Sequence, residues 1–430
     1  MTALLIVMFA LMLAGVPVAL SIGVSGAAFL LFFESVPVAA IAQRMVVGVD
    51  SFTLLAIPLF VLAGTLMARG DITPKIMRLA SLLVGRLHGG LACVLVVSCM
   101  LFGAISGSGI ADVAAIGSIV VPMMREQKYS MPFTASLLGC AGSLGTIIPP
   151  SIVMVVLGVT MGVSIGRLFL AGIVPGLLLG AGLMVGSWFV ARRENYPRGS
   201  RLRAPEVWAA LREAVLPMGA PLIIVVGFRG GVFTATETGA VAALYALLLA
   251  AFVYRKISLR DFLDVCYETA LTSASVLLII AAASLFGWIL ALEEVPRRVA
   301  EGVLSATEGL ANPYWTVLLL FNLMLLVLGT FMESIAIVII TVPVFMPMMT
   351  RLGVDPIHLG VMIAVNLAIG ANSPPLGVDL MTACKIADVP YASSFRYIFP
   401  FLGIMTLVLL AVIFFPSLST WVPNAMMGGR

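Results

Sequence analysis

Charged residues are scarce in this chain. Only 10% of its 430 residues are Asp, Glu, Lys or Arg, whereas 61% are apolar. A soluble protein carries about a quarter charged residues, and many apolar runs here exceed the roughly 20 residues that cross a bilayer as a helix. We therefore expect an all-α polytopic membrane protein. The small positive excess lies in loops, so it indicates topology and not a nucleic-acid partner.

Cysteine and histidine are also few. The five cysteines lie in apolar surroundings without CxxC spacing, which favours buried packing. The two histidines, His88 and His358, have no neighbouring ligand residues, so we expect no transition-metal site and no cofactor. The first apolar run, 5–33, lacks a basic leader and a small-residue cleavage site, which predicts a retained span.

Basic segments assign sides to the apolar runs, which fall near 5–33, 52–68, 91–124, 131–165, 168–191, 213–229, 232–254, 270–292, 314–349, 358–388 and 395–416. The arginine-rich segment 192–203 and the basic segment 69–86 both indicate the cytoplasmic side. Three apolar runs lie between these two segments, so both can be cytoplasmic only if one of the runs enters and leaves by the same face. Run 91–124, interrupted by GAISGSG, is therefore predicted to be a re-entrant helical hairpin. Run 314–349, interrupted by GTFMES, is then a second hairpin that opens from the opposite face. The pattern predicts nine crossings, a cytoplasmic N-terminus and an external C-terminus.

The sequence matches itself at an offset of 225 positions. Pro122-Met123-Met124 aligns with Pro347-Met348-Met349, and Pro149-Pro150 aligns with Pro374-Pro375. We therefore expect inverted-topology repeats, as in secondary transporters. The first repeat spans 1–191, with hairpin 91–124 and a broken helix at 131–165. A cytoplasmic linker and connecting span, 192–231, precede the second repeat, 232–416, with hairpin 314–349 and a broken helix at 358–388. An external tail, 417–430, follows.

Each doubled proline interrupts an apolar run, in GSLGTIIPPS (142–151) and LAIGANSPPL (367–376). Proline removes a backbone donor and breaks the helix, which frees backbone groups that must be satisfied inside the bilayer. A Na⁺ ion coordinated by freed carbonyls and Ser/Thr hydroxyls would satisfy them. Packing of small polar residues between helices is the alternative. The candidate ion-binding residues at the hairpin tips and breaks are Ser106, Gly107, Ser108, Ser143, Gly145, Thr146, Thr330, Met332, Glu333, Ser334, Gly370 and Asn372.

Few acids lie within the predicted spans, and an intramembrane carboxylate is a functional candidate. Asp112 follows the first tip, where it is expected to cap the second helix of that hairpin. Glu237 lies near Arg229, so a structural ion pair and a role in transport are both open. Asp112, Arg229, Glu237 and Asp379 are secondary candidates for the site.

Four motifs carry a family resemblance: SGSGIADVAAIG (106–117), GSLGTIIPPS (142–151), FTATE (233–237) and SPPLG (373–377). With them the chain resembles the large membrane subunit (DctM/SiaM-like M subunit) of tripartite ATP-independent periplasmic (TRAP) transporters. The resemblance implies a Na⁺-coupled importer of organic acid anions in the bacterial inner membrane, with an elevator mechanism. It also implies two partners, a small four-helix membrane subunit and a periplasmic substrate-binding protein.

The resemblance also suggests how the candidate residues divide. One Na⁺ site would join Ser106–Ser108 to Ser143–Thr146, and a second would join Thr330–Ser334 to Gly370–Asn372, with substrate between the tips. The implied substrate-binding residues are Ser108, Thr146, Pro149, Asn372, Ser373 and Pro374. Asp379 stands where the family leads us to expect asparagine.

Two alternatives differ from a binding-protein-dependent importer. A stand-alone Na⁺/carboxylate symporter or anion exchanger of related architecture would share the broken helices. An intramembrane enzyme with Ser106 or Ser108 as nucleophile would need a base within reach, and neither histidine lies in a suitable span. We therefore predict a transporter and not an enzyme.

Overall fold

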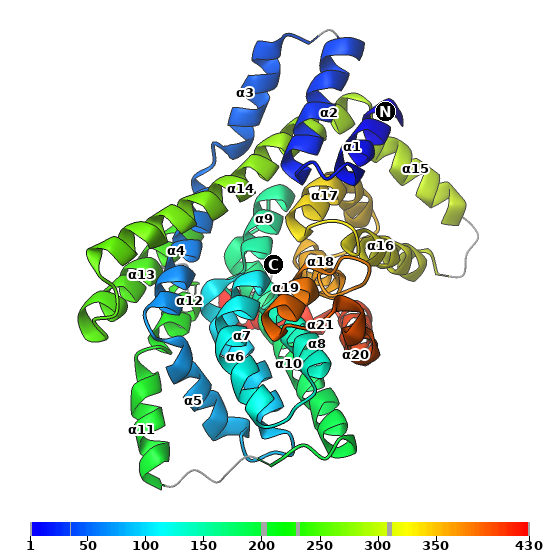
Figure 1. Cartoon of the computed structure of the whole chain (residues 1–430). Helices are drawn as coiled ribbons and strands as arrows, with labels where there is room; N and C mark the ends of the chain where they lie inside the picture. Colours follow the sequence, from blue (N-terminus) through cyan, green and yellow to red (C-terminus); the bar gives the residue numbers. More distant parts are fainter. Residues whose placement is uncertain (1, 35, 199–203, 229–232, 308–311, 429–430) are drawn as a thin grey trace.

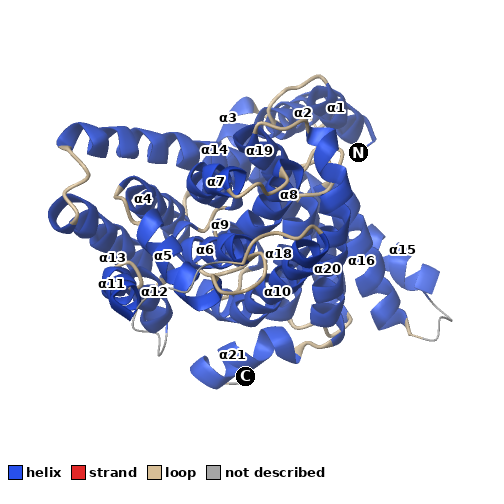
Figure 2. Cartoon of the chain, turned by 60° about the horizontal axis from the view of Figure 1, so that its bottom comes forward, coloured by secondary structure: helices blue, strands red, loops and turns tan. Residues whose placement is uncertain are grey.

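The computed structural model describes the whole chain except residues 1, 35, 199–203, 229–232, 308–311 and 429–430. The described residues form helices and loops without a strand (Figure 2), as the composition predicts. The α-helices are α1 (Thr2–Leu13), α2 (Val18–Phe33), α3 (Val38–Val49), α4 (Ala56–Arg69), α5 (Thr73–Val84), α6 (Gly90–Ser106), α7 (Gly109–Glu126), α8 (Met131–Gly142), α9 (Ile152–Met161), α10 (Ile165–Arg193), α11 (Ala204–Val215), α12 (Gly219–Phe228), α13 (Ala235–Leu248), α14 (Leu259–Leu292), α15 (Val295–Thr307), α16 (Pro313–Gly329), α17 (Ser334–Arg351), α18 (Pro356–Gly370), α19 (Val378–Ala387), α20 (Phe395–Phe414) and α21 (Ser417–Met427). Short 3₁₀ or π turns are η1 (Phe52–Leu55), η2 (Ser143–Thr146), η4 (Leu249–Val253) and η5 (Tyr391–Ser394).

Local sequence explains many of the helix starts. Asp355 precedes α18, and its carboxylate accepts hydrogen bonds from the Ile357 and His358 amides at 2.8 and 3.0 Å. Ser151 caps α9 in the same way, because its hydroxyl accepts from the Met154 amide. Such caps satisfy amides that have no partner inside the helix. Short helices can therefore begin inside an apolar protein without leaving donors unpaired.

The helix bounds in the two halves follow the sequence offset. Helix α7 and helix α17 are each 18 residues long, and both of their ends lie 225 positions apart. Helices α8 and α18 also begin 225 positions apart. The Pro149-Pro150 and Pro374-Pro375 peptide bonds, at matching positions, are both cis. The order of elements from α6 to α9 is thus the order from α16 to α19. The opposite orientation of the halves remains a prediction.

Six described helical segments are long and apolar enough to cross a membrane, or seven if the pair α11 and α12, bent by 48°, is one span. Five of them match predicted spans: Phe52–Arg69, Ile165–Arg193, Ala235–Val253, Leu259–Leu292 and Tyr391–Phe414. The sixth is α17, the second helix of the expected hairpin 314–349. The nine expected crossings therefore do not correspond to nine long helices, because runs 5–33, 131–165 and 358–388 are each divided and run 213–229 falls on the bent pair α11 and α12.

The run 5–33 was expected to be one span and forms two helices instead. Helices α1 and α2 are separated by a turn in which Gly15 has a φ of +84°, and Pro17 directly precedes α2. Glycine adopts this left-handed conformation without a Cβ penalty, and proline cannot continue the preceding helix. The two helices pack against each other (Figure 1).

The broken helices lie at the centre of the molecule. Figure 1 shows α6, α7, α8, α9, α18 and α19 grouped there, with α1, α2 and α3 on one side. Helix α19 packs on both α7 and α8, and α9 packs on α17, so elements of the two halves interlock. The long helix α14 runs along this group and contacts α2, α3, α4 and α17. The centre is therefore a body built from both halves, with α14 as part of its surround.

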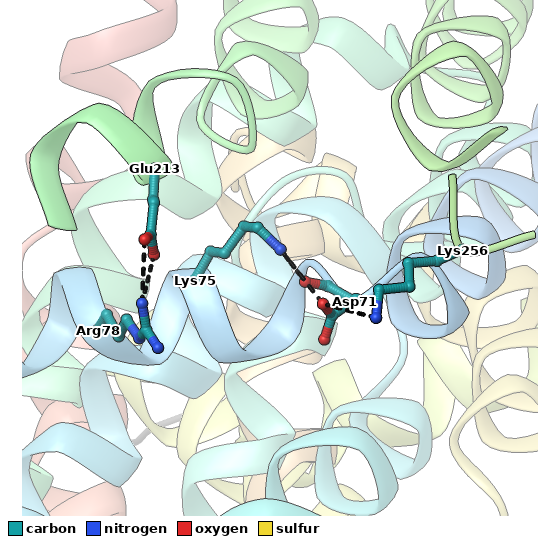
Figure 3. Close-up of polar contacts among 5 residues, drawn as sticks. All are labelled: Asp71, Lys75, Arg78, Glu213 and Lys256. Atoms are coloured by element: carbon teal, nitrogen blue, oxygen red, sulfur yellow. Dashed lines mark hydrogen bonds and ion pairs between the residues drawn. The ribbon is translucent and has the colours of Figure 1, made fainter. Parts of the chain in front are cut away.

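Helix α5 is amphipathic and is held by charged contacts on its polar side (Figure 3). The Arg78 guanidinium donates to the Glu213 carboxylate of α11 at 2.7 Å. Lys75 and Lys256 lie 3.5 and 3.7 Å from the Asp71 carboxylate. The buried side of α5 packs on α6, the first hairpin helix. Helix α5 thus joins the first hairpin to the surrounding helices.

Candidate functional site

The first hairpin tip is a tight turn between α6 and α7. Gly107 has a φ of +66°, which favours glycine, and its amide donates to the Gly103 carbonyl at 3.1 Å. The Ser106 hydroxyl contacts Asp112 Oδ1, one turn into α7. Ser106 and Asp112 are both buried. The tip therefore holds a carboxylate and a hydroxyl away from solvent.

The first break faces this tip. After α8 the chain forms one 3₁₀ turn, η2, and the Pro149-Pro150 pair precedes α9. The Ile152 amide at the start of α9 donates to the Gly107 carbonyl of the tip at 3.1 Å. Within the break, the Ser151 hydroxyl donates to the Thr146 carbonyl at 2.6 Å. The tip and the break of the first half are therefore joined by a backbone hydrogen bond.

The second half has a related arrangement. Glu333 precedes α17, and its carboxylate accepts from the Ile335 amide at 3.1 Å. The Leu376 amide, in the loop between α18 and α19, donates to the Thr330 carbonyl at 3.3 Å. Here a glutamate occupies the helix-cap position that Ser108 holds in the first half. The second tip thus carries a carboxyl group at a position where the first tip has a hydroxyl.

Two glycine pairs bring each tip against its break. A Cβ added at Gly103 would lie 2.8 Å from the Cα of Gly145. A Cβ added at Gly329 would lie 2.8 Å from the Cα of Gly370. Distances this short require one of the two atoms to move, so only glycine fits in the present arrangement. The close backbone approach is the same in both halves.

The two breaks meet at Ser143. Its hydroxyl lies 3.0 Å from Asp379 Oδ2 and 3.1 Å from the Gly139 carbonyl, either of which can accept its proton. The Asn372 amide group donates to the same hydroxyl and, at 3.0 Å, to the Ala368 carbonyl. Ser143, Asn372 and Asp379 are all buried. A residue of the first half is therefore enclosed by polar groups of the second.

Asp112 Oδ2 and Asn372 Oδ1 are among the buried oxygens that have no hydrogen-bond partner within the described residues. Asp112 Oδ2 points to the Gly103–Gly145 contact, and Asn372 Oδ1 lies beside Gly139. A buried carboxylate or amide oxygen without a donor is costly unless a cation lies beside it. Hard cations prefer oxygen ligands of this kind, so these residues fit a bound Na⁺.

A cavity of about 180 Å³ lies between the two tips. Ser108 and Thr146 line it from the first half, and Met332, Glu333 and Asp379 line it from the second. Thr272 and Val276 of α14 contribute another part of the wall. The cavity is therefore bounded by both tips and by a helix outside the central body.

The candidate substrate-binding residues are only partly brought together. Ser108 and Thr146 line the cavity, whereas Pro149, Asn372, Ser373 and Pro374 do not. The Ser373 hydroxyl instead donates to the Ile369 carbonyl of its own helix at 2.9 Å. Six of the candidate ion-binding residues line the cavity: Gly107, Ser108, Thr146, Met332, Glu333 and Ser334. Ser106 and Gly145 lie against Asp112 instead, and Gly370 lies against Gly329. The Thr330 carbonyl accepts a hydrogen bond from the Leu376 amide.

Three expectations about individual residues change. Asp112 was expected to cap α7, but Ser108 holds that position and the Asp112 carboxylate contacts the Ser106 hydroxyl. Ser143 was grouped with the first tip, but its hydroxyl contacts Asn372 and Asp379. Asp379 was a secondary candidate, and it lies buried against Ser143 at the junction of the breaks.

Glu237 has a local role in this structure. The Thr234 amide and hydroxyl donate to its carboxylate at 2.8 and 2.9 Å, and the Glu237 amide donates to the Thr234 hydroxyl at 3.3 Å. This capping box explains the FTATE motif as the start of α13. Arg229, the other partner that was considered, lies outside the described residues.

Sequence reasoning missed the contribution of α14. Thr272 was read as part of an apolar scaffold span, although Thr269, Ser273 and Ser275 lie close to it in the sequence. A cluster of hydroxyl residues within such a run was the available signal. The position of the cluster beside the tips depends on how α14 packs, which one sequence does not specify.

Comparison with known proteins identifies relatives over nearly the full chain. Residues 5–418 match the family model described as the DctM component of the tripartite ATP-independent periplasmic transporter. The chain is 39% identical to a sialic acid TRAP transporter large permease protein of Vibrio cholerae, covering 97% of each chain. It is 37% identical to a C4-dicarboxylate TRAP transporter large permease protein of Rhodobacter capsulatus, covering 99% of this chain and 100% of that one.

A longer relative and a solved structure add to this. An isethionate TRAP transporter permease protein of Oleidesulfovibrio alaskensis is 39% identical over 95% of this chain, and the chain spans 64% of that relative's length. The crystal structure of the YdaH transporter of Alcanivorax borkumensis has a TM-score of 0.62 at 15% identity, covering 92% of this chain and 91% of that one. At this identity the likeness concerns the fold alone.

Proposed function

This chain belongs to the DctM family of tripartite ATP-independent periplasmic transporters, and we propose that it imports an organic acid anion by Na⁺-coupled secondary transport. In this proposal the chain is the large inner-membrane subunit, which works with a small membrane subunit and receives its substrate from a periplasmic binding protein. The observation that carries the proposal is the meeting of both tips and both breaks around one cavity of about 180 Å³.

The Na⁺ coupling rests on the buried oxygens. Asp112, with Ser106 and the backbone near Gly145, would hold one Na⁺. The breaks would hold another through Ser143, Asn372 and Asp379, where the sequence had suggested Thr330–Ser334 with Gly370–Asn372. Bound Na⁺ would supply positive charge beside these carboxylates and so reduce their repulsion of an anionic substrate.

The elevator motion rests on packing between the halves. Contacts of α19 with α7 and α8, and of α9 with α17, make the hairpins and breaks one body. That body meets α4 at a small-residue contact, where a Cβ added at Gly64 would lie 2.8 Å from the Cα of Ser106. We infer that the body slides past α4 and α14, and that the inverted repeat provides the two end states.

Reconstitution tests this function directly. The chain is placed in proteoliposomes with its small membrane subunit, and uptake of labelled succinate, N-acetylneuraminate or isethionate is measured with the cognate binding protein outside. Uptake is expected to require an inward Na⁺ gradient and the binding protein. Equal uptake without Na⁺ on either side would refute the coupling. Strong uptake by the chain alone would instead support a stand-alone Na⁺/carboxylate symporter or anion exchanger.

A further inference from the structure

A second cavity lies beside the one between the tips. Its volume is about 400 Å³, and its walls include Arg69 at the end of α4 and Glu268 on α14. The Arg69 guanidinium contacts the Glu268 carboxylate. Ser106 and Ser108 of the first tip form another part of the wall. The ion pair and the first hairpin tip therefore line the same cavity.

The two cavities adjoin. Ser108, Ile152 and Thr272 line both of them, so a solute that leaves the space between the tips past these residues enters the larger cavity. Arg69 also begins the basic segment 69–86, which the charge pattern assigns to the cytoplasmic side. The larger cavity is thus placed between the tips and the side on which an imported substrate is released.

The charges of the two cavities differ. The smaller cavity carries the acids Glu333 and Asp379. Of all the described residues that line either cavity, Arg69 alone has a cationic side chain. A carboxylate that leaves the tips therefore meets its first protein cation at Arg69. Guanidinium groups bind carboxylates through two parallel hydrogen bonds, a geometry that lysine cannot match.

The present partner of Arg69 is replaceable. The side chains of Arg69 and Glu268 are 38% and 49% exposed, and a hydrated ion pair of this kind adds little net stability. Both residues belong to α4 and α14, which pack against each other outside the central body. Exchange of the Glu268 carboxylate for a substrate carboxylate therefore requires only a side-chain movement.

We propose that Arg69 is the carboxylate-binding residue of a second substrate position, and that Glu268 occupies Arg69 when substrate is absent. This inference rests on the proposed function, since it concerns the same organic acid anion. The substrate moves from the cavity between the tips to Arg69, displaces Glu268, and then leaves toward the cytoplasmic side. Glu268 acts as an internal competitor that keeps the binding of substrate at Arg69 weak enough for release.

Opposite effects of two substitutions test this competition. Uptake is measured in proteoliposomes with both partner subunits and the best transported of succinate, N-acetylneuraminate and isethionate. Arg69→Gln is expected to raise the half-saturating substrate concentration about tenfold or more, and Arg69→Lys to have an intermediate effect. Glu268→Gln is expected to lower it several-fold. The matched control is Arg78→Gln in α5, which breaks the exposed ion pair of Arg78 with Glu213 of α11 (Figure 3). This substitution should leave the half-saturating substrate concentration unchanged.

A purely structural ion pair gives another result. If the pair only holds α4 against α14, Arg69→Gln and Glu268→Gln change the half-saturating concentration in the same direction, with equal loss of thermal stability. That outcome overturns the proposal but leaves Na⁺-coupled transport intact. A parent complex that transports none of the three acids would show that none of them is its substrate, and a measurement that needs no transport then decides on Arg69.

That measurement uses thiol chemistry at Thr272, which lines both cavities. Thr272→Cys is made with Cys266→Ser, because the other four cysteines are buried. The ratio of reaction rates with anionic 2-sulfonatoethyl and cationic 2-(trimethylammonium)ethyl methanethiosulfonate reports the local potential. We expect Arg69→Gln to lower this ratio at least fivefold and Glu268→Gln to raise it. A ratio that does not respond to Arg69→Gln overturns the proposal.

Discussion

The hydroxyl of Ser143 lies 3.0 Å from the carboxylate of Asp379, although the two residues are 236 positions apart in the chain. Each comes from a break next to a doubled proline, one in each half. Because of this contact, a change of charge at one break alters the electrostatic environment of the other. Coupling between ion and substrate requires such a shared element.

Asp379→Asn tests the charge at this contact. The amide can still accept a hydrogen bond from Ser143, so the local packing is kept while the negative charge is removed. We expect the Na⁺ concentration for half-maximal uptake to rise about tenfold, which corresponds to about 1.4 kcal/mol. Sodium titration of uptake in proteoliposomes measures this. An unchanged titration curve would show that Asp379 does not contribute to ion binding.

Gly145→Ala tests the close approach of the first tip to its break. The new methyl group would press on the Asp112 carboxylate, and overpacking of this kind costs about 1–3 kcal/mol. Thermal unfolding of the purified protein in detergent should show a lower midpoint. Gly287→Ala in α14 is the matched control, since an added Cβ there meets no atom within 4 Å. Gly287→Ala should be neutral or slightly stabilising. An equal decrease of the unfolding midpoint in both variants would contradict this account.

Glu237→Ala separates a cap from a transport residue. Glu237 accepts from both Thr234 groups at the start of α13, outside the cavity between the tips. Loss of a helix cap costs about 0.5–2 kcal/mol, so we expect a lower unfolding midpoint with an unchanged Na⁺ dependence of uptake. Thr234→Ala should reproduce the stability loss. If Glu237→Ala alters the Na⁺ titration as Asp379→Asn does, the cap is not the main role of Glu237.

The sequence was informative where local chemistry decides the outcome. The doubled prolines, Gly107 and the spacing of α7 and α17 predicted two broken segments at matching positions, because proline and glycine act on the backbone near them. The sequence did not reveal that Ser143 turns to Asn372 and Asp379, or that Thr272 lines the cavity. Those contacts depend on how distant helices pack, and a hydroxyl group in an apolar run has no preference for one neighbour over another.

The same limit explains the error at run 5–33. An apolar run of this length fits a single span by composition, and the turn at Gly15 and Pro17 interrupts it with only two residues of local signal. In contrast, the FTATE motif contains its own explanation, since Thr234 and Glu237 have the spacing of a capping box. Reading it as a possible ion pair with Arg229 overlooked that simpler local role.

Gly64→Leu tests whether the first tip moves past α4. In the present structure a Cβ at Gly64 would lie 2.8 Å from the Cα of Ser106, so a leucine there cannot be accommodated while the tip stays in contact. If this contact is passed through in each transport cycle, uptake should fall more than tenfold. Gly23→Ala is the control, because its added Cβ would meet Ala282 at an ordinary 3.5 Å between α2 and α14. Thermal unfolding is measured for both variants, since uptake that falls only in proportion to the amount of folded protein would indicate a packing defect and no obstruction of movement.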